Sequence, residues 1–186
     1  MLKHLAIAVV GFLIFAGQAD AIDFSEIRSE DEKRIRRNAE QGDASSQYVL
    51  GLNYQHGFYI TQKDYVEAVS WYRKAAEQGL AEAQFSLGLM YQQGQGVLQD
   101  YPEAKRWYLL AAEQGNGEAQ ANLGMMYGKG LGIIQDYVVA HMWSNLSAST
   151  GNKDARRNRD ILARRMTPDQ IAEAQRLARE WMAERQ

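Results

Sequence analysis

The pentapeptide at residues 75–79 reads AAEQG, and the same five letters return at residues 111–115. Glycines recur at nearly the same interval along the rest of the chain. They are Gly42, Gly79, Gly115 and Gly151, spaced 37, 36 and 36 residues apart. A fixed period of about 20 to 50 residues is typical of solenoids and other repeat arrays. The repeat therefore has to be interpreted before any single residue of this 186-residue chain.

Further positions keep the same register. Each copy contains a Leu-Gly pair with a tyrosine three residues after the glycine, then an Asp-Tyr pair, an alanine and a tryptophan. These positions include Gly51, Gly88 and Gly124; Tyr54, Tyr91 and Tyr127; Asp64, Asp100 and Asp136; Ala68, Ala104 and Ala140; and Trp71, Trp107 and Trp143. So many aligned positions are not an accident of composition. We predict three units, at residues 43–79, 80–115 and 116–151.

Each unit is predicted to form two helices. Apolar residues at helical spacing indicate the first helices, over residues 44–55, 81–93 and 118–127. Glycine readily takes the left-handed conformation that closes a helix, and one stands at each of their ends: Gly57, Gly94 and Gly130. The second helices are predicted to begin after the aspartates, because an aspartate carboxylate accepts hydrogen bonds from first-turn amides. Glu67 and Glu103 are placed to complete capping boxes with two of these aspartates.

The glycines inside the first helices indicate how the helices pack. A glycine in a helix interior costs about 1 kcal/mol relative to alanine. Three of them at one register, Gly51, Gly88 and Gly124, therefore require a compensating contact. We expect a close approach of paired helices, with the alanines of the second helix opposite and the tryptophans between neighbouring units. One hairpin cannot bury its own apolar face, so the units are predicted to stack into a solenoid.

Both ends depart from the repeat. Residues 22–42 are predicted to contain an N-terminal capping helix that begins at Ser29, with Glu32 three residues on as in a capping box. Residues 152–186 are predicted to be a degenerate C-terminal capping pair of helices, with Arg159 where the repeat has its leucine. Its last helix begins at Thr167, where threonine, proline and glutamine form a strong start signal.

Residues 1–21 are predicted to be a secretory signal peptide. A short basic start precedes an unbroken apolar run over residues 5–16, and Ala19-Asp20-Ala21 is a small-x-small cleavage pattern. The alternative is a retained anchor, but a membrane span needs about 20 apolar residues, more than this run provides. Cleavage is expected after Ala21, which would deliver the mature protein to the periplasm or the medium. The chain has no cysteine, so the disulfides that such a compartment permits cannot form.

The second unit carries the pattern most clearly. Residues 81–115 read AEAQFSLGLMYQQGQGVLQDYPEAKRWYLLAAEQG. This run resembles the Sel-one-like repeat, a relative of the tetratricopeptide repeat, and the resemblance covers residues 43–151. Departures fall at Tyr59 in the first turn and at Ser144 and residues 147–150 in the third unit. The resemblance implies an all-α fold, a right-handed α/α superhelical solenoid of helix-turn-helix repeats that usually serves as a protein-interaction scaffold and has no catalytic residues.

The residues themselves offer no candidate for catalysis, for a cofactor or for a metal site. The G-x-G turns follow no strand and lack the third glycine of a dinucleotide-binding fingerprint. Helix capping accounts for the three aspartates. His56 falls in the last turn of a helix, His141 is predicted to be a variable surface residue, and Met125 and Met126 fill apolar space rather than bind copper. The balance of 21 Lys and Arg against 23 Asp and Glu does not suit a nucleic-acid partner.

One surface is predicted to bind a partner. In tetratricopeptide-like stacks the first helices line a concave groove, and the resemblance carries that geometry to an apolar strip with a polar rim. The candidate residues are Tyr48, Leu52, Gln55, His56, Phe85, Leu89, Gln92, Gln93, Met125 and Lys129. Such a strip can dock an extended peptide or a partner helix. The alternative is that these side chains pack only against the adjacent first helix, and burial is the stronger expectation for Leu52 and Leu89.

These features together predict an exported, non-catalytic scaffold that binds a partner protein or peptide through the concave solenoid surface. No cofactor, no nucleic acid and no stable membrane span after signal cleavage are expected. An alternative of a different class is a cell-wall-associated or β-lactam-binding enzyme or ligand-binding protein. Some cysteine-rich relatives have been linked to penicillin binding, but this chain lacks cysteine. A docking subunit for an exported polysaccharide or signalling assembly is a third possibility.

Overall fold

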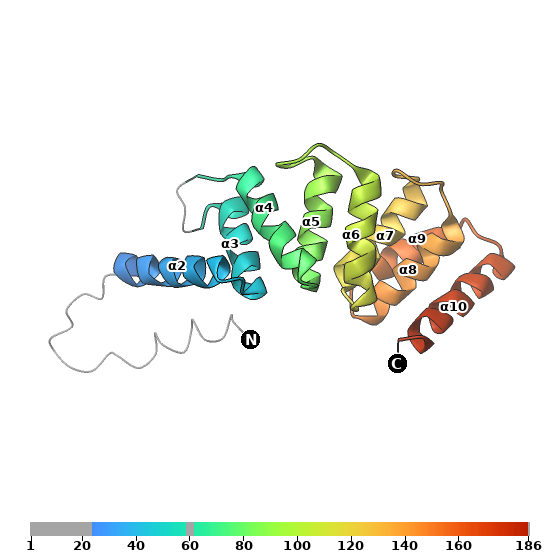
Figure 1. The fold of residues 1–186 in the computed structure, drawn as a ribbon. Coiled ribbons are helices and arrows are strands. Elements are labelled where there is room, and N and C mark those ends of the chain that lie inside the picture. The colour runs from blue at the N-terminus through green and yellow to red at the C-terminus, as the bar shows by residue number, and fades with distance from the viewer. Residues whose placement is uncertain (1–23, 59–61, 186) are drawn as a thin grey trace, which may run out of the picture.

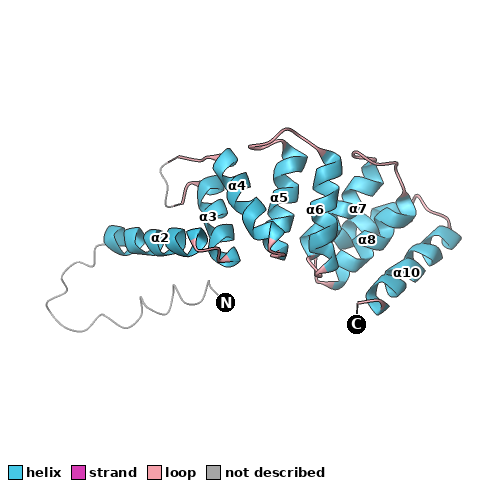
Figure 2. Cartoon of the chain, viewed as in Figure 1, coloured by secondary structure: helices cyan, strands magenta, loops and turns pink. Residues whose placement is uncertain are grey.

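The protein is a row of paired helices. The computed structural model describes residues 24–58 and 62–185, and this part of the chain contains helices and no strand (Figures 1 and 2). The predicted signal segment and Tyr59 lie outside the described residues. The helices are α2 (Phe24–Glu40), α3 (Ala44–His56), α4 (Tyr65–Glu77), α5 (Ala81–Gln93), α6 (Tyr101–Glu113), α7 (Gly117–Lys129), α8 (Tyr137–Ser149), α9 (Lys153–Ala163) and α10 (Pro168–Ala183). The predicted all-α solenoid of helical hairpins is confirmed.

Both ends of each hairpin helix follow the predicted signals. Gly57, Gly94 and Gly130 close the first helices with φ of 72°, 67° and 69°, a left-handed conformation that favours glycine. The aspartate carboxylates accept first-turn amide hydrogen bonds of 2.9–3.0 Å in all three second helices. α5 has its expected bounds, and α3 and α7 extend one or two residues beyond theirs, within the usual uncertainty of helix termini.

The predicted capping boxes of α4 and α6 are wrong in their second half. A capping box needs the aspartate's own backbone N–H to bond the glutamate side chain. That N–H is already used: Asp64 donates to the Tyr54 carbonyl at 2.9 Å, and Asp100 donates to the Tyr91 carbonyl at 3.0 Å. The third unit repeats this bond between Asp136 and Tyr127. The bond closes the loop onto the end of the first helix in every unit.

The start predicted for the N-terminal capping helix is also wrong. α2 begins at Phe24, so Ser29 lies inside the helix rather than at its cap. Charged residues with good helix propensity surround this serine, and a single serine in a helix interior costs only a fraction of 1 kcal/mol (~0.5). The local cap signal was therefore too weak to stop the helix.

The glycines inside the first helices allow the paired helices to approach closely, as predicted. In the first two units, however, the atoms nearest to these glycines belong to a tyrosine ring rather than to an alanine. A Cβ atom on Gly51 would lie 2.6 Å from the Tyr72 ring and 3.3 Å from the Ala68 carbonyl oxygen. A Cβ atom on Gly88 would meet the Tyr108 ring at 2.6 Å. Both tyrosines are fully buried. Glycine therefore makes room for the tyrosine of the Trp-Tyr pair as well as for the alanine.

The repeated glutamines link the units, which answers why the AAEQG stretch recurs. The buried Gln84 donates to the carbonyl of Ala76 at 3.2 Å, across the boundary between the first two units. Its side-chain oxygen accepts from Gln114, the glutamine of the second AAEQG, at 2.8 Å. Gln78 donates in the same way to Gln47 at 2.7 Å. The pentapeptide thus ends a helix and supplies an amide that satisfies a buried amide.

The tryptophans pack between units, as predicted. Trp107 belongs to the second unit but lies in a cluster with Val69 and Tyr72 of the first. Trp71 packs with Ala39 and Ile35 of α2, so the N-terminal helix covers the open end of the first unit. These contacts are what a stack of hairpins requires, because no unit shields its own apolar side.

The C-terminal helices do not form a regular hairpin. α9 takes the place of a first helix and packs on α7 and α8, but α10 packs mainly on α8 rather than pairing with α9. Trp181 of α10 meets Trp143 of α8 edge-on, with ring centroids 5.5 Å apart, and Ala178 joins the same core. α10 begins with the predicted cap at Thr167, and its capping box is complete. It covers the last tryptophan instead of building a fourth unit.

Candidate protein-interaction surface

The predicted strip residues lie on the first helices α3, α5 and α7, and the side that these helices and α9 present is here called the first-helix face. Its two rows are partly buried: Tyr48, Phe85 and Ala121 form one, and Leu52, Leu89 and Met125 form the other. Tyr48 lies 5.8 Å from the Tyr72 ring, and Phe85 lies 6.0 Å from the Tyr108 ring, centroid to centroid. Partial burial raises the pKa of the Tyr48 hydroxyl. The strip therefore packs on the core and still presents area to solvent.

Two members of the predicted polar rim serve the core. The Gln55 side-chain oxygen accepts a hydrogen bond of 2.5 Å from the Tyr72 hydroxyl, and Gln92 accepts one of 2.8 Å from Tyr108. Burial raises the pKa of both tyrosines, so they donate as neutral phenols. In the first two units the side-chain oxygens of these glutamines are therefore already hydrogen-bonded to buried tyrosines. The exposed rim members are His56, beside Phe58 with centroids 5.2 Å apart, and Gln93 and Lys129.

The third unit lacks both partners of this pair. Ser144 replaces the tyrosine, and Gly128 replaces the glutamine. A Cβ atom on Gly124 would now meet the Ser144 hydroxyl at 2.7 Å, where the first two units present a ring. Leu162 of α9 lies over the surface that this leaves, 3.5 Å from a Cβ placed on Gly128. A cavity of about 170 Å³ remains between α7, α8 and α9.

A larger cleft adjoins this cavity. It lies between α7 and α9 and has a volume of about 380 Å³. Met125, Lys129 and Asn158 line both hollows, so the two are continuous along the first-helix face. Of the predicted strip residues, Ala121, Met125 and Lys129 line these hollows. The first-helix face is therefore hollowed at its C-terminal end.

Sequence reasoning missed the polar residues of the cleft. Asn122, Asn152 and Asn158 line it together with Glu118. Asn152 donates to Glu118 at 3.2 Å, and Asn158 donates to the Ser144 hydroxyl at 3.0 Å. Asparagine carries both donors and an acceptor, which suits it to bind peptide backbone. The sequence did contain a signal for the cleft, namely the replacement of glutamine by Gly128 together with the replacement of tyrosine by Ser144. Losing both side chains leaves space between the helices.

His141 is not the surface residue that was predicted. Its side chain is buried, 3% exposed, and its Nδ1 has no hydrogen-bond partner among the described residues. The pKa of the imidazole is lowered, first by burial and then by the nearby Arg159 guanidinium, with Asp160 opposing. Position 141 is covered because α9 packs on α8. The imidazole is therefore held neutral in the folded protein.

The described residues offer no group of three or more His, Asp or Glu side chains that could hold a metal ion. Likewise, none of the helices within residues 24–58 and 62–185 combines the length and the apolar character needed to cross a bilayer. The Asp64, Asp100 and Asp136 carboxylates bond backbone amides, as predicted, rather than facing one another.

Two solved structures resemble the chain closely. The crystal structure of a protective antigen present in uropathogenic Escherichia coli strains, which displays an SLR fold, matches with a TM-score of 0.75 and 36% identity. The match covers 84% of this chain and 33% of that one. A Sel1 repeat protein from Oxalobacter formigenes matches with a TM-score of 0.65 and 35% identity, over 70% of this chain and 56% of that one. The chain therefore spans about a third and just over half of these proteins.

No curated protein matches the chain. The Sel1 repeat, which is the Sel-one-like repeat of the sequence-based resemblance, matches residues 44–80, 81–116 and 117–152. Proteins of this fold generally mediate protein–protein interactions as non-catalytic scaffolds. With three consecutive repeats over more than half of its length, the chain belongs to the Sel1 repeat family.

Proposed function

We propose that the protein is an exported, non-catalytic scaffold that binds a partner protein or peptide through the concave side of its solenoid, the first-helix face. The observation that carries the proposal is the pair of continuous hollows between α7 and α9. They combine apolar surface at Met125 with asparagines that can bond a peptide backbone. The first two units provide a shallower continuation through Phe85 and Tyr48.

The proposed occupant is an extended segment of a partner protein. One apolar side chain of this segment enters the hollow at Met125, where the tyrosine–glutamine pair of the other units is missing. Its backbone lies along Asn122 and Asn158, and Lys129 borders both hollows. Ligand sites of this kind are mostly apolar, with a few polar groups that fix orientation. The repeat fold supports the binding role.

Photo-crosslinking tests the binding face directly. A photoreactive amino acid at Lys129, exposed beside the hollows, is expected to capture a protein partner in cells. The matched control carries the same amino acid at Ser70, which is exposed on the second helix α4. Capture from residue 129 alone supports the proposal. Equal capture from both positions, or none from residue 129, contradicts it.

Matched substitutions localise the contact. Met125→Glu places a charge at the hollows, and Leu52→Glu places one at the equivalent position of the first unit. We expect Met125→Glu to abolish capture and Leu52→Glu to weaken it less. Circular dichroism checks that each variant remains folded. Capture that survives Met125→Glu would exclude the α7–α9 hollows as the binding surface.

Export rests on the basic start, the apolar run and the small-x-small pattern at Ala19–Ala21. We expect the mature protein in the periplasm or the medium, with Ile22 as its first residue. Cell fractionation and intact-mass measurement check both points. A chain that keeps residues 1–21 and pellets with membranes would instead be an anchored scaffold.

A further inference from the structure

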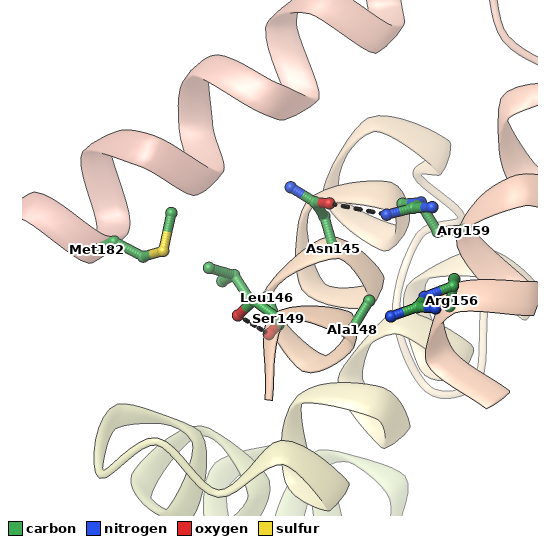
Figure 3. A pocket seen from close by; sticks show the side chains of 7 residues that line it. All are labelled: Asn145, Leu146, Ala148, Ser149, Arg156, Arg159 and Met182. Carbon is green, nitrogen blue, oxygen red and sulfur yellow. Dashed lines mark hydrogen bonds between the residues drawn. The ribbon is translucent and has the colours of Figure 1, made fainter. Parts of the chain in front are cut away.

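A third hollow lies on another side of the molecule, between α8, α9 and α10. It has a volume of about 210 Å³ and is here called the end slot (Figure 3). Asn145, Leu146 and Ala148 of α8 form its floor, Arg156 and Arg159 approach from α9, and Met182 faces them from α10. None of the first-helix strip residues lines it. The end slot is therefore separate from the face assigned to the proposed partner.

The repeat register explains why this space is open. Arg156 stands at the position of the buried Gln120, and Arg159 stands at the position of the buried Leu123. In a further unit, a second helix paired with α9 would cover both positions. α10 instead packs on α8 through Trp181, which leaves the α9 side of the slot uncovered. The end slot is the place of a missing helix.

The charge of the slot is one-sided. No Asp or Glu lines it. Arg159 bonds Asp160 at 2.8 Å and Asn145 at 3.4 Å, but the Arg156 guanidinium has no ion-pair or hydrogen-bond partner among the described residues. Met182, which is 37% exposed, provides apolar surface beside the two arginines, above the buried Leu146 and Ala148. Arg156, an unpaired cation next to apolar surface, has thus replaced the buried glutamine that the repeat carries at this position.

We propose that the end slot binds an acidic segment of a partner protein, with a carboxylate of that segment on Arg156 and Arg159. Guanidinium groups bind carboxylates in a bidentate geometry with charge-assisted hydrogen bonds. The methylene groups of a glutamate side chain would cover the exposed Met182, which an inorganic anion cannot do. This gives the solenoid two independent contacts, one on the first-helix face and one at its C-terminal end.

Titration with a short acidic peptide tests this site. The probe is an N-acetylated, C-amidated tetraglutamate, and tetraglutamine is its neutral counterpart. Binding to the isotope-labelled protein is followed by NMR, with the Met182 methyl group and the Asn145 and Ala148 amides as reporters. We expect tetraglutamate to shift these signals and tetraglutamine to leave them unchanged.

The repeat itself supplies the decisive variant. Arg156→Gln restores the residue that the units carry and is expected to weaken tetraglutamate binding about tenfold, the effect of losing one charge-assisted hydrogen bond. Arg157→Gln is the control, because Arg157 is exposed, pairs with Asp154 at 3.4 Å and does not line the slot. It should change the affinity less than about twofold.

Three results would overturn the proposal. The first is no shift at the end slot with tetraglutamate. The second is an equal loss of affinity in Arg156→Gln and Arg157→Gln, which would mean that diffuse positive charge attracts the peptide. The third is inorganic phosphate binding as tightly as tetraglutamate, which would make the slot a general anion site. None of these results bears on photo-crosslinking from Lys129, so the two proposals stand or fall separately.

Discussion

The first two units, residues 43–115, and the C-terminal region, residues 116–185, share one hairpin design but use their polar side chains differently. In the first two units, buried tyrosines bond Gln55 and Gln92, and the glutamines of the AAEQG stretches bond Gln47 and Gln84. In the third unit, Ser144 and Thr150 stand where the tyrosine and the glutamine would be. The regular units bond these tyrosines and glutamines internally, although among the described residues Asn53 Nδ2 and the Nε1 atoms of Trp71 and Trp107 are buried without a hydrogen-bond partner.

The C-terminal region leaves space and unpaired groups. The Gln120 side-chain oxygen is buried without a partner in the part of the chain that the structure describes, because Thr150 bonds the Ser147 carbonyl at 2.8 Å instead. The three hollows described above all lie within residues 118–182. A further hollow of about 320 Å³ lies in the regular units, where Val66, Arg73 and Val97 line it. The comparison teaches that departures from the repeat add hollows to those that the regular stack already has.

The largest expected effect tests how much each region contributes to stability. Trp107→Ala removes a buried side chain that joins the first two units, and we expect a loss of about 3 to 5 kcal/mol in the free energy of unfolding. Trp181→Ala removes a partly buried ring at the end and should cost about 2 kcal/mol. Chemical denaturation followed by circular dichroism measures both. Equal losses would show that α10 is as essential as the contact between units.

The glycine register offers the next comparison. In Gly88→Ala the new methyl group would lie 2.6 Å from the buried Tyr108 ring, and we expect a loss of about 2 kcal/mol. In Gly124→Ala the nearest atom is the Ser144 hydroxyl at 2.7 Å, which can rotate away, and alanine gains helix propensity. This variant should lose less than about 1 kcal/mol. The reverse order in thermal unfolding would refute the role assigned to the tyrosine ring.

Restoring the repeat in the third unit should stabilise it. Thr150→Gln supplies the amide that the buried Gln120 oxygen lacks, and we expect a gain of up to about 1 kcal/mol. The converse change, Gln114→Thr, leaves Gln84 unpaired and should cost about 1 to 2 kcal/mol. Equilibrium unfolding of both variants gives the comparison. A destabilised Thr150→Gln protein would mean that the third unit cannot accommodate the glutamine link.

The smallest effect concerns pH. The pKa of His141 is lowered in the folded protein, so the unfolded chain binds a proton at a higher pH than the folded one. Its contribution to stability is complete above the ordinary histidine pKa of about 6.5 and is lost as the pH falls below that value. His141→Val, which copies Val69 of the first unit, should flatten the fall in unfolding free energy between about pH 7 and pH 5. An unchanged slope would assign that fall to other groups.

Much of the fold could be predicted from the repeat register. Periodicity and capping residues identify the paired helices, because these signals act within a few neighbouring residues. The wrong start at Ser29 and the incomplete capping boxes share one cause. A local motif does not reveal that a longer helix continues, as in α2, or that an amide is already bonded, as at Asp64.

The candidate site was less predictable. Met125 and Lys129 line the hollows, whereas Gln55 and Gln92 serve the core. Asn122, Asn152 and Asn158 were missed because their importance depends on how far α9 lies from α7. His141 was misplaced because its burial depends on the next first helix, α9, packing on α8, just as the equivalent Val69 of α4 is buried. Contacts between units follow from packing that no single unit specifies.

The amino-acid sequence by itself determined the helices, their pairing and the stacking of three units. The repeat period, the capping residues and the apolar spacing are patterns of residues along the chain, so the amino-acid sequence reveals them without the tertiary structure. The tertiary structure alone decided that α10 packs on α8, that the lost tyrosine–glutamine pair leaves a hollow, and that Arg156 stands unpaired in the end slot. These features depend on how closely helices from different units approach one another. That distance is set by the packing of side chains that lie far apart in the chain.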